Sequence, residues 1–145
     1  MSGRTGLVAA IALAGLCVSG AMGSRPGRRV AWLRDEDKAF SEARRTGKPL
    51  LVEAWAAWCA ACKLLDRDTW SDPEVQRQVR ARYVPLRLDF STEDASSDAQ
   101  RERYGVQALP TVLICKPPGC AEAAGHRATG YLRPAEMLAF LTAEP

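Results

Sequence analysis

The feature that most constrains the fold is a close pair of cysteines placed where a buried strand ends and a helix begins. Residues 50–55 form a short run that is mostly apolar on both faces, as expected of a central strand. Cys59 and Cys62 follow, and the segment from Cys59 to about residue 68 is predicted to be helical. The chain is therefore expected to be an α/β protein with thiol chemistry at this junction.

Helix and strand patterns alternate along the rest of the chain. A helix is expected to open at Asp35 and to stop at Gly47, because acidic residues suit the positive end of a helix and glycine ends helices. Further helices are predicted at 71–82 (capped by Ser71), from 94 or 97 to 104, and from Pro134 onward, and further strands at 84–89, 111–115 and 127–130. Strand–helix–strand units imply parallel pairing, and the last two strands add an antiparallel pair. The expected fold is a small α/β sandwich with a central mixed sheet flanked by helices.

The N-terminal residues have the pattern of an export signal. Arg4 is followed by an apolar run at 7–18 and then by small residues that offer a cleavage site before Ser24. We expect residues 1–23 to be a signal peptide. An uncleaved membrane anchor is the alternative, because the uncharged window of 5–24 is just long enough to span a bilayer. Both outcomes place the rest of the chain outside the cytoplasm, in the periplasm or an equivalent compartment, where disulfides persist.

The remainder of the chain divides into a linker, residues 24–33, and one domain, residues 34–145, which is long enough to bury a hydrophobic core. The net charge of +3 arises near the N-terminus: without the four arginines before Val30, sixteen basic residues face seventeen acidic ones. The basic isoelectric point is therefore no argument for nucleic-acid binding. The single histidine excludes a metal site built from several histidines.

A thiol at the N-terminus of a helix is more acidic than a free thiol. Unpaired backbone N–H groups and the helix dipole stabilise an anion there. Lowering a thiol pKa from ~8.5 to ~7 raises the ionised fraction at pH 7 from about 3% to about half. Cys59, the first and more exposed cysteine, is therefore the expected nucleophile. Cys62, one turn further along, is placed to resolve a mixed disulfide.

Two other interpretations of the Cys59–Cys62 pair compete with this one. A zinc site would need a second pair of ligands, but Cys115 and Cys120 have a different spacing and follow a different strand, and only His126 remains. An inert structural disulfide would stabilise the fold little, since the entropy that a crosslink removes from the unfolded chain grows with loop length. We therefore favour a redox-active pair that binds no metal.

Several segments together resemble the thioredoxin superfamily. Residues 51–63 look like its active-site segment, residues 105–111 look like its cis-proline loop, and Gly130 with the closing helix also match. The resemblance covers about residues 35–141 and implies a thioredoxin-like three-layer sandwich. Within the superfamily, the Ala-Ala dipeptide between the cysteines and residues 69–75 are most similar to the C-terminal periplasmic domain of the DsbD thiol:disulfide interchange proteins and to related secreted thioredoxin-like proteins.

The resemblance implies a role for each matching residue. Cys59 attacks a substrate disulfide and Cys62 resolves the intermediate. Glu53 matches the buried acidic residue beneath the cysteines, where an apolar pocket raises the pKa of a carboxyl and lets it exchange a proton with Cys62; the alternative is a side chain that points to solvent. Asp66 matches a second acidic residue of the DsbD-like domain, although a single acid on a helix is more often only solvated.

The same resemblance predicts a rim that binds substrate. Pro110 is expected to be cis and to leave the backbone of Leu109 free to pair with an extended substrate segment. Trp58 is expected on the apolar edge of this rim, whereas Trp55 is more often a core residue. The Ala-Ala dipeptide lacks the proline of thioredoxin and the histidine of strong oxidants, which favours a reductant or interchange role.

Cys115 and Cys120 are not part of the family pattern. They enclose Lys-Pro-Pro-Gly, a turn sequence that favours bringing the two thiols together. A disulfide here would close a six-residue loop and contribute about 2 kcal/mol in the chain-entropy model. We expect a structural disulfide, with two free thiols or a second redox relay as the alternatives.

The sequence thus predicts an extracytoplasmic protein-disulfide reductase or thiol:disulfide interchange enzyme that uses the Cys59–Cys62 dithiol and no other cofactor. Its expected partners are proteins with thiols or disulfides and a membrane electron donor of the DsbD type, and it is expected to be a monomer. Two other classes of protein compete: a redox-inert binding or chaperone module, and a copper(I) metallochaperone. The intact cysteines disfavour the first, and the scarcity of histidine and methionine near the pair disfavours the second.

Overall fold

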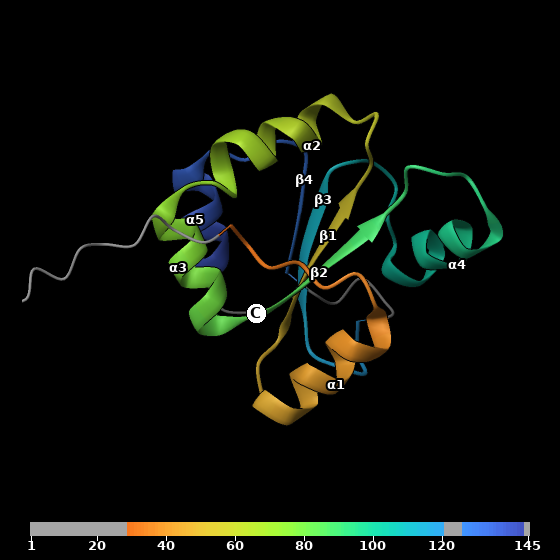
Figure 1. The fold of residues 1–145 in the computed structure, drawn as a ribbon, viewed down its shortest axis with the longest axis horizontal. Coiled ribbons are helices and arrows are strands. Elements are labelled where there is room, and N and C mark those ends of the chain that lie inside the picture. Colours follow the sequence, from red (N-terminus) through yellow and green to blue (C-terminus); the bar gives the residue numbers. More distant parts are fainter. Residues whose placement is uncertain (1–28, 121–125, 144–145) are drawn as a thin grey trace, which may run out of the picture.

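A four-stranded mixed sheet forms the centre of the fold, with the strand order β2-β1-β3-β4 (Figure 1). The strands are β1 (Leu50–Trp55), β2 (Val84–Asp89), β3 (Thr111–Cys115) and β4 (His126–Thr129). β1 pairs with β2 in parallel, and the other two pairs are antiparallel. The predicted mixed sheet is confirmed, and β1, β2 and β3 begin and end where the sequence placed them.

The computed structural model describes residues 29–120 and 126–143. The expected signal peptide, residues 1–23, and residues 24–28 of the expected linker lie outside the described residues. Within the described ranges, no helix is long and apolar enough to cross a membrane.

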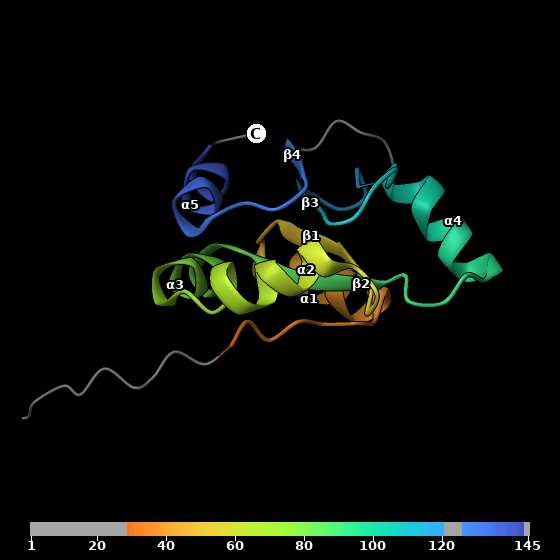
Figure 2. The same ribbon diagram turned by 90° about the horizontal axis from the view of Figure 1, so that it is seen from above.

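Helices cover both faces of the sheet. They are α1 (Glu36–Thr46), α2 (Ala60–Leu64), η1 (Leu65–Thr69), α3 (Pro73–Arg82), α4 (Ala95–Tyr104) and α5 (Pro134–Thr142). α1 and α4 contribute side chains to one hydrophobic cluster, and η1, α3 and α5 contribute to the other. Figures 1 and 2 show the sheet between these two groups of helices. The predicted three-layer sandwich is therefore confirmed.

Strand β1 places an acidic residue in the core. Leu50, Val52 and Ala54 are buried in the cluster with α1, and Leu51 is buried in the cluster on the other face. Because side chains alternate along a strand, Glu53 faces the same side as Leu51, toward η1 and α3. It is also fully buried. The fold thus holds a carboxyl group inside the protein, on the face of the sheet that η1 covers.

Helix α3 begins one residue later than the sequence predicted. Asp72, rather than Ser71, is the cap, because its carboxylate accepts hydrogen bonds from the backbone N–H groups of Glu74 and Val75. Pro73 occupies the first helical position, where a missing N–H costs nothing. Ser71 instead donates its hydroxyl to a carbonyl oxygen of the preceding turn. Both residues are good caps by type, so their order along the chain did not distinguish them.

The helix predicted from Cys59 to about residue 68 is α-helical only in its first part. α2 continues directly into η1, a π-helical turn in which the backbone N–H of Trp70 donates to the carbonyl oxygen of Leu65 at 2.8 Å. Trp70 is buried at the end of this wide turn. Asp66 lies near the start of the same turn. The side chains of Asp66 and Trp70 therefore lie on the same side of the sheet as Glu53.

The described end of the predicted linker packs on the domain. Val30 is buried in the cluster with α3 and α5, and Leu33 forms a parallel bridge with Leu86 at the edge of the sheet. The N–H of Leu33 donates to the carbonyl oxygen of Pro85 at 2.9 Å, and its own carbonyl accepts from the N–H of Arg87 at 2.8 Å. The linker boundary expected after Leu33 therefore falls inside a packed segment. A single bridging pair produces no alternating pattern that the sequence could show.

Candidate active site

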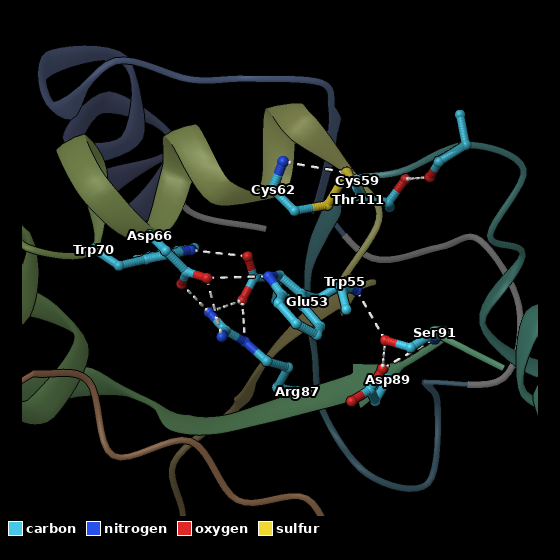
Figure 3. Close-up of a disulfide and its surroundings, with 12 residues drawn as sticks. Glu53, Trp55, Cys59, Cys62, Asp66, Trp70, Arg87, Asp89, Ser91 and Thr111 are labelled. Atoms are coloured by element: carbon cyan, nitrogen blue, oxygen red, sulfur yellow. Dashed lines mark hydrogen bonds and ion pairs between the residues drawn. A yellow bond between two sulfur atoms is a disulfide. The ribbon is translucent and has the colours of Figure 1, made fainter.

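Cys59 and Cys62 form a disulfide at the start of α2, beyond the end of β1 (Figure 3). Cys59 is the cap of the helix: its backbone is extended, and its Sγ accepts a hydrogen bond from the backbone N–H of Cys62 at 3.1 Å. Both residues are buried, with an exposed fraction of 6% for Cys59 and none for Cys62. Cys59 is therefore the more accessible cysteine, and its sulfur already faces a helix N–H group that stabilises negative charge.

The residues predicted for the substrate rim are either neighbours of the disulfide in sequence or packed against the residues around it. Trp58, which directly precedes Cys59, has 60% of its surface exposed. Leu109 is half-buried and packs against the cluster that contains both cysteines. The Leu109–Pro110 peptide bond is cis, and the carbonyl oxygen of Pro110 accepts from the N–H of Gly130 at 2.8 Å. The contribution of this rim to substrate binding remains a prediction.

Glu53 lies on β1 and has no exposure to solvent. Its Oε1 accepts a hydrogen bond from the indole N–H of Trp70 at 2.9 Å, and its Oε2 accepts one from Nε of Arg87 at 2.7 Å (Figure 3). Burial raises the pKa of Glu53 to about 7, because the lost solvation of the carboxylate outweighs the attraction of Arg87 and the hydrogen bond from Trp70. A solvent-facing Glu53, the alternative left by the sequence, is excluded. At that pKa the carboxyl can both accept and release a proton near neutral pH.

Asp66 lies on η1, at the solvent side of the same group of residues. Its carboxylate accepts hydrogen bonds from the indole N–H of Trp55 at 3.0 Å and from Nη2 of Arg87 at 2.5 Å. The side chain is 36% exposed and lines a surface cavity of about 520 Å³. Asp66 is thus more than a solvated helix residue, because Arg87 joins it to Glu53. Its part in the chemistry remains a prediction.

Arg87 is the member of the site that sequence reasoning missed. It lies on β2 directly opposite Glu53 in the parallel register, and its side chain is 7% exposed. Its guanidinium lies 4.8 Å from the ring centroid of Trp32 and 5.4 Å from that of Trp55. A signal was present in the sequence. Glu53 and Arg87 hold the same position in two predicted strands that were expected to pair, and opposite charges placed in this way indicate a buried ion pair.

The described residues contain no group of three or more histidine, cysteine, aspartate or glutamate side chains that could hold a metal ion. The reactive groups that the structure brings together around the disulfide are the sulfur atoms of Cys59 and Cys62, the carboxyl groups of Glu53 and Asp66, and the guanidinium of Arg87.

Cys115 and Cys120 form a second disulfide, and both residues are buried. Cys115 is opposite Leu50, at the start of β1, whereas the Cys59–Cys62 disulfide follows the end of that strand. The strand rise makes a six-residue strand about 16 Å long. The two disulfides therefore lie at opposite ends of the sheet, which disfavours a relay between them.

Comparison of sequences places this architecture among known proteins. The family model of thioredoxin-like proteins matches residues 31–117. The chain is 36% identical over 104 residues to the thiol:disulfide interchange protein DsbD of Cronobacter sakazakii, covering 72% of this chain and 17% of that protein. It is 35% identical over 114 residues to the protein of the same name from Yersinia enterocolitica, covering 79% of this chain and 19% of that protein. The chain thus spans less than a fifth of the length of these relatives.

Solved structures share the fold. A thioredoxin from Thermus thermophilus is similar with a TM-score of 0.65 at 27% identity, covering 79% of this chain and 85% of that one. The reduced C-terminal domain of DsbD from Neisseria meningitidis is similar with a TM-score of 0.61 at 18% identity, covering 73% of this chain and 90% of that domain. At that lower identity the second likeness concerns the fold alone.

Proposed function

This chain belongs to the thioredoxin-like family and is similar to its DsbD branch, and from that premise we propose that it reduces or exchanges disulfides of proteins outside the cytoplasm. The observation that carries the proposal is the disulfide at the cap of α2. There the Sγ of Cys59 accepts a hydrogen bond from the backbone N–H of Cys62, and the buried carboxyl of Glu53 lies on β1, beneath the disulfide. Disulfide exchange requires a thiolate nucleophile, a thiol that resolves the mixed disulfide and a group that accepts a proton. Cys59, Cys62 and Glu53 can supply these three groups.

The proposed reaction begins with the reduced protein. The Cys59 thiolate attacks a substrate disulfide, forms a mixed disulfide with one sulfur and displaces the other as a thiolate. Cys62 then gives its proton to the Glu53 carboxylate and attacks the Sγ of Cys59, which releases the second substrate sulfur. The substrate is reduced, and the protein ends as the Cys59–Cys62 disulfide found in the structure. The disulfide pair is its own redox centre, and an electron donor must reduce it again.

The surroundings of the pair favour giving electrons to substrates. Ala60 and Ala61 lie between the cysteines, and neither side chain can donate a hydrogen bond to a thiolate. The Glu53 carboxylate, when ionised, repels a nearby thiolate and so disfavours the reduced form. A pair whose reduced form is weakly stabilised is a better reductant. We therefore propose a reductase or interchange role rather than the donation of disulfides.

The proposed setting is the periplasm or an equivalent compartment. Residues 1–23 would export the chain as a signal peptide or hold it as an anchor, and a membrane protein of the DsbD type would supply electrons. Protein substrates would contact Trp58 and pair with the backbone of Leu109, next to Pro110. The chain would act as a monomer, with the Cys115–Cys120 disulfide serving only to hold the fold.

Reduction of insulin with dithiothreitol as the electron source tests this proposal. The full chain is expected to make the reduced insulin B chain precipitate much faster than dithiothreitol alone does, because a thiol held at a helix cap is partly ionised at neutral pH. The Cys115→Ser/Cys120→Ser double variant is the matched control and is expected to keep this activity. In the opposite direction, the oxidised protein should transfer its disulfide to a reduced, unfolded protein only slowly. A folded protein that gives no acceleration of insulin reduction would be a redox-inert binding module.

A further inference from the structure

Beneath the disulfide, one guanidinium is shared between two carboxyl groups. Nη2 of Arg87 lies 2.6 Å from Oε2 of Glu53 and 2.5 Å from Oδ1 of Asp66. Glu53 and Arg87 are buried, whereas Asp66 reaches the cavity at the surface. With all three groups ionised, the cluster has one negative charge in excess, a state that burial disfavours. Glu53 is the carboxyl that would take up a proton to remove this excess, because it is the one without access to water.

Aromatic side chains fix the position of the guanidinium. Trp32 and Trp55 lie against it, and Trp32 also makes an edge contact with Trp70 at 5.1 Å between ring centroids. The indole N–H of Trp70 donates to Glu53, and that of Trp55 donates to Asp66. Each carboxylate is therefore held by one indole and by the shared arginine, as the dashed lines in Figure 3 show.

Few other charges face this group. On the strand and helix packed against Glu53, the facing charges are Arg87 from β2 and Asp66 from η1. Three cations, Arg29, Lys63 and Arg67, line the cavity in front of Asp66 but lie on the solvent side. The charge of Glu53 thus depends mainly on one attractive partner and one repulsive one.

We propose that Arg87 is a positioning residue that favours the ionised form of Glu53 beneath the disulfide and divides its positive charge between Glu53 and Asp66. With Arg87 in place, the carboxylate is available to take the proton of Cys62. Without it, Glu53 keeps its own proton at neutral pH. Asp66 acts in the opposite sense, because it repels the Glu53 carboxylate and competes for the guanidinium. The consequence for disulfide exchange rests on the proposed function, whereas the charge of Glu53 in the oxidised protein does not.

The test is a titration of the Glu53 carboxyl in the oxidised full chain, followed by carbon-13 NMR and assigned by the signal that is lost in Glu53→Gln. Arg87→Gln is expected to raise the titration midpoint by one pH unit or more, which is at least about a tenfold gain in proton affinity. Arg87→Lys keeps the positive charge but loses the several N–H donors of the guanidinium, so it should raise the midpoint by less. Asp66→Asn should lower the midpoint. Arg34→Gln, which removes an exposed arginine paired with Asp89, is the control and should leave it unchanged.

An unchanged or lower midpoint in folded Arg87→Gln would overturn the proposal. If that variant does not fold, Asp66→Asn decides, because an unchanged or higher midpoint there contradicts the shared guanidinium. The insulin assay separates this from the proposed function. An active wild-type protein whose Glu53 titration ignores Arg87 would keep the function and lose the inference. An inactive protein whose Glu53 midpoint shifts as predicted in the variants would keep the inference and lose the proposed function.

Discussion

Changing Cys59 to serine is expected to lower insulin reduction to the rate of dithiothreitol alone. The hydroxyl of serine is not ionised at the helix cap, so no nucleophile remains there. Changing Cys62 to serine is expected to stop the reaction one step later. Cys59 still attacks, but the protein itself cannot resolve the product, so a prereduced variant freed of dithiothreitol accumulates a mixed disulfide between Cys59 and the substrate. Mass spectrometry of the unreduced mixture measures this adduct directly.

The two variants serve as controls for each other, because each removes one sulfur atom from the same buried disulfide and should change stability to a similar extent. A trapped adduct in Cys59→Ser and none in Cys62→Ser would mean that the roles of the two cysteines are exchanged. Full activity in both variants would contradict the assignment of the site.

Changing Glu53 to glutamine is expected to remove a pH dependence of stability of about 3 kcal/mol. In the folded protein the pKa of Glu53 is about 7, against an ordinary value of 4.5. Below pH 4.5 the carboxyl is protonated in both the folded and the unfolded chain, so it adds no pH dependence. As the pH rises from 4.5 toward 7, the unfolded chain gives up this proton first, so the free energy of unfolding falls. Above pH 7 both states are ionised and the full cost is present.

Chemical denaturation of the oxidised protein at pH 5 and at pH 8 measures this effect. The wild-type protein should lose most of the predicted amount between these two conditions, and Glu53→Gln should lose little of it. Glu42→Gln is the control: Glu42 is exposed on α1, and its hydrogen-bonded pair with Arg45 lowers its pKa, so it does not titrate in this range. Equal stability of the wild-type protein at both pH values would contradict a buried carboxyl with a raised pKa.

Strands β1, β2 and β3 could be predicted from the sequence because each is a short, mostly apolar run that is largely buried in the sheet. The cap of α3 was misplaced by one residue, since Ser71 and Asp72 are both good caps and only the hydrogen bonds to Glu74 and Val75 distinguish them. The packing of Val30 and Leu33 was missed for a different reason. It depends on contacts with α3 and α5 for Val30 and with β2 for Leu33, and these elements lie more than forty residues further along the chain.

The sulfur chemistry of the site is a local property of the sequence, whereas the partners that set the charge of Glu53 depend on how distant elements pack. Cys59 and Cys62 are neighbours in sequence, and their position at a helix start is a local property. The environment of Glu53 comes instead from Arg87 and Trp70, which the fold brings to it from other elements. An arginine within a strand gives no local sign of whether it is buried, and only the parallel register shows that it faces the carboxyl.

The reduction potential of the Cys59–Cys62 pair tests the central claim most directly. The Cys115→Ser/Cys120→Ser variant, in which one pair titrates, would be equilibrated with dithiothreitol or glutathione buffers and the oxidised fraction measured. A reductase is expected to give a value of about −230 to −270 mV, at the thioredoxin end of the scale. A value near about −120 mV would make the protein an oxidant of folding proteins instead. A pair that does not titrate at all would be a structural bridge, and the claim of a redox-active site would be wrong.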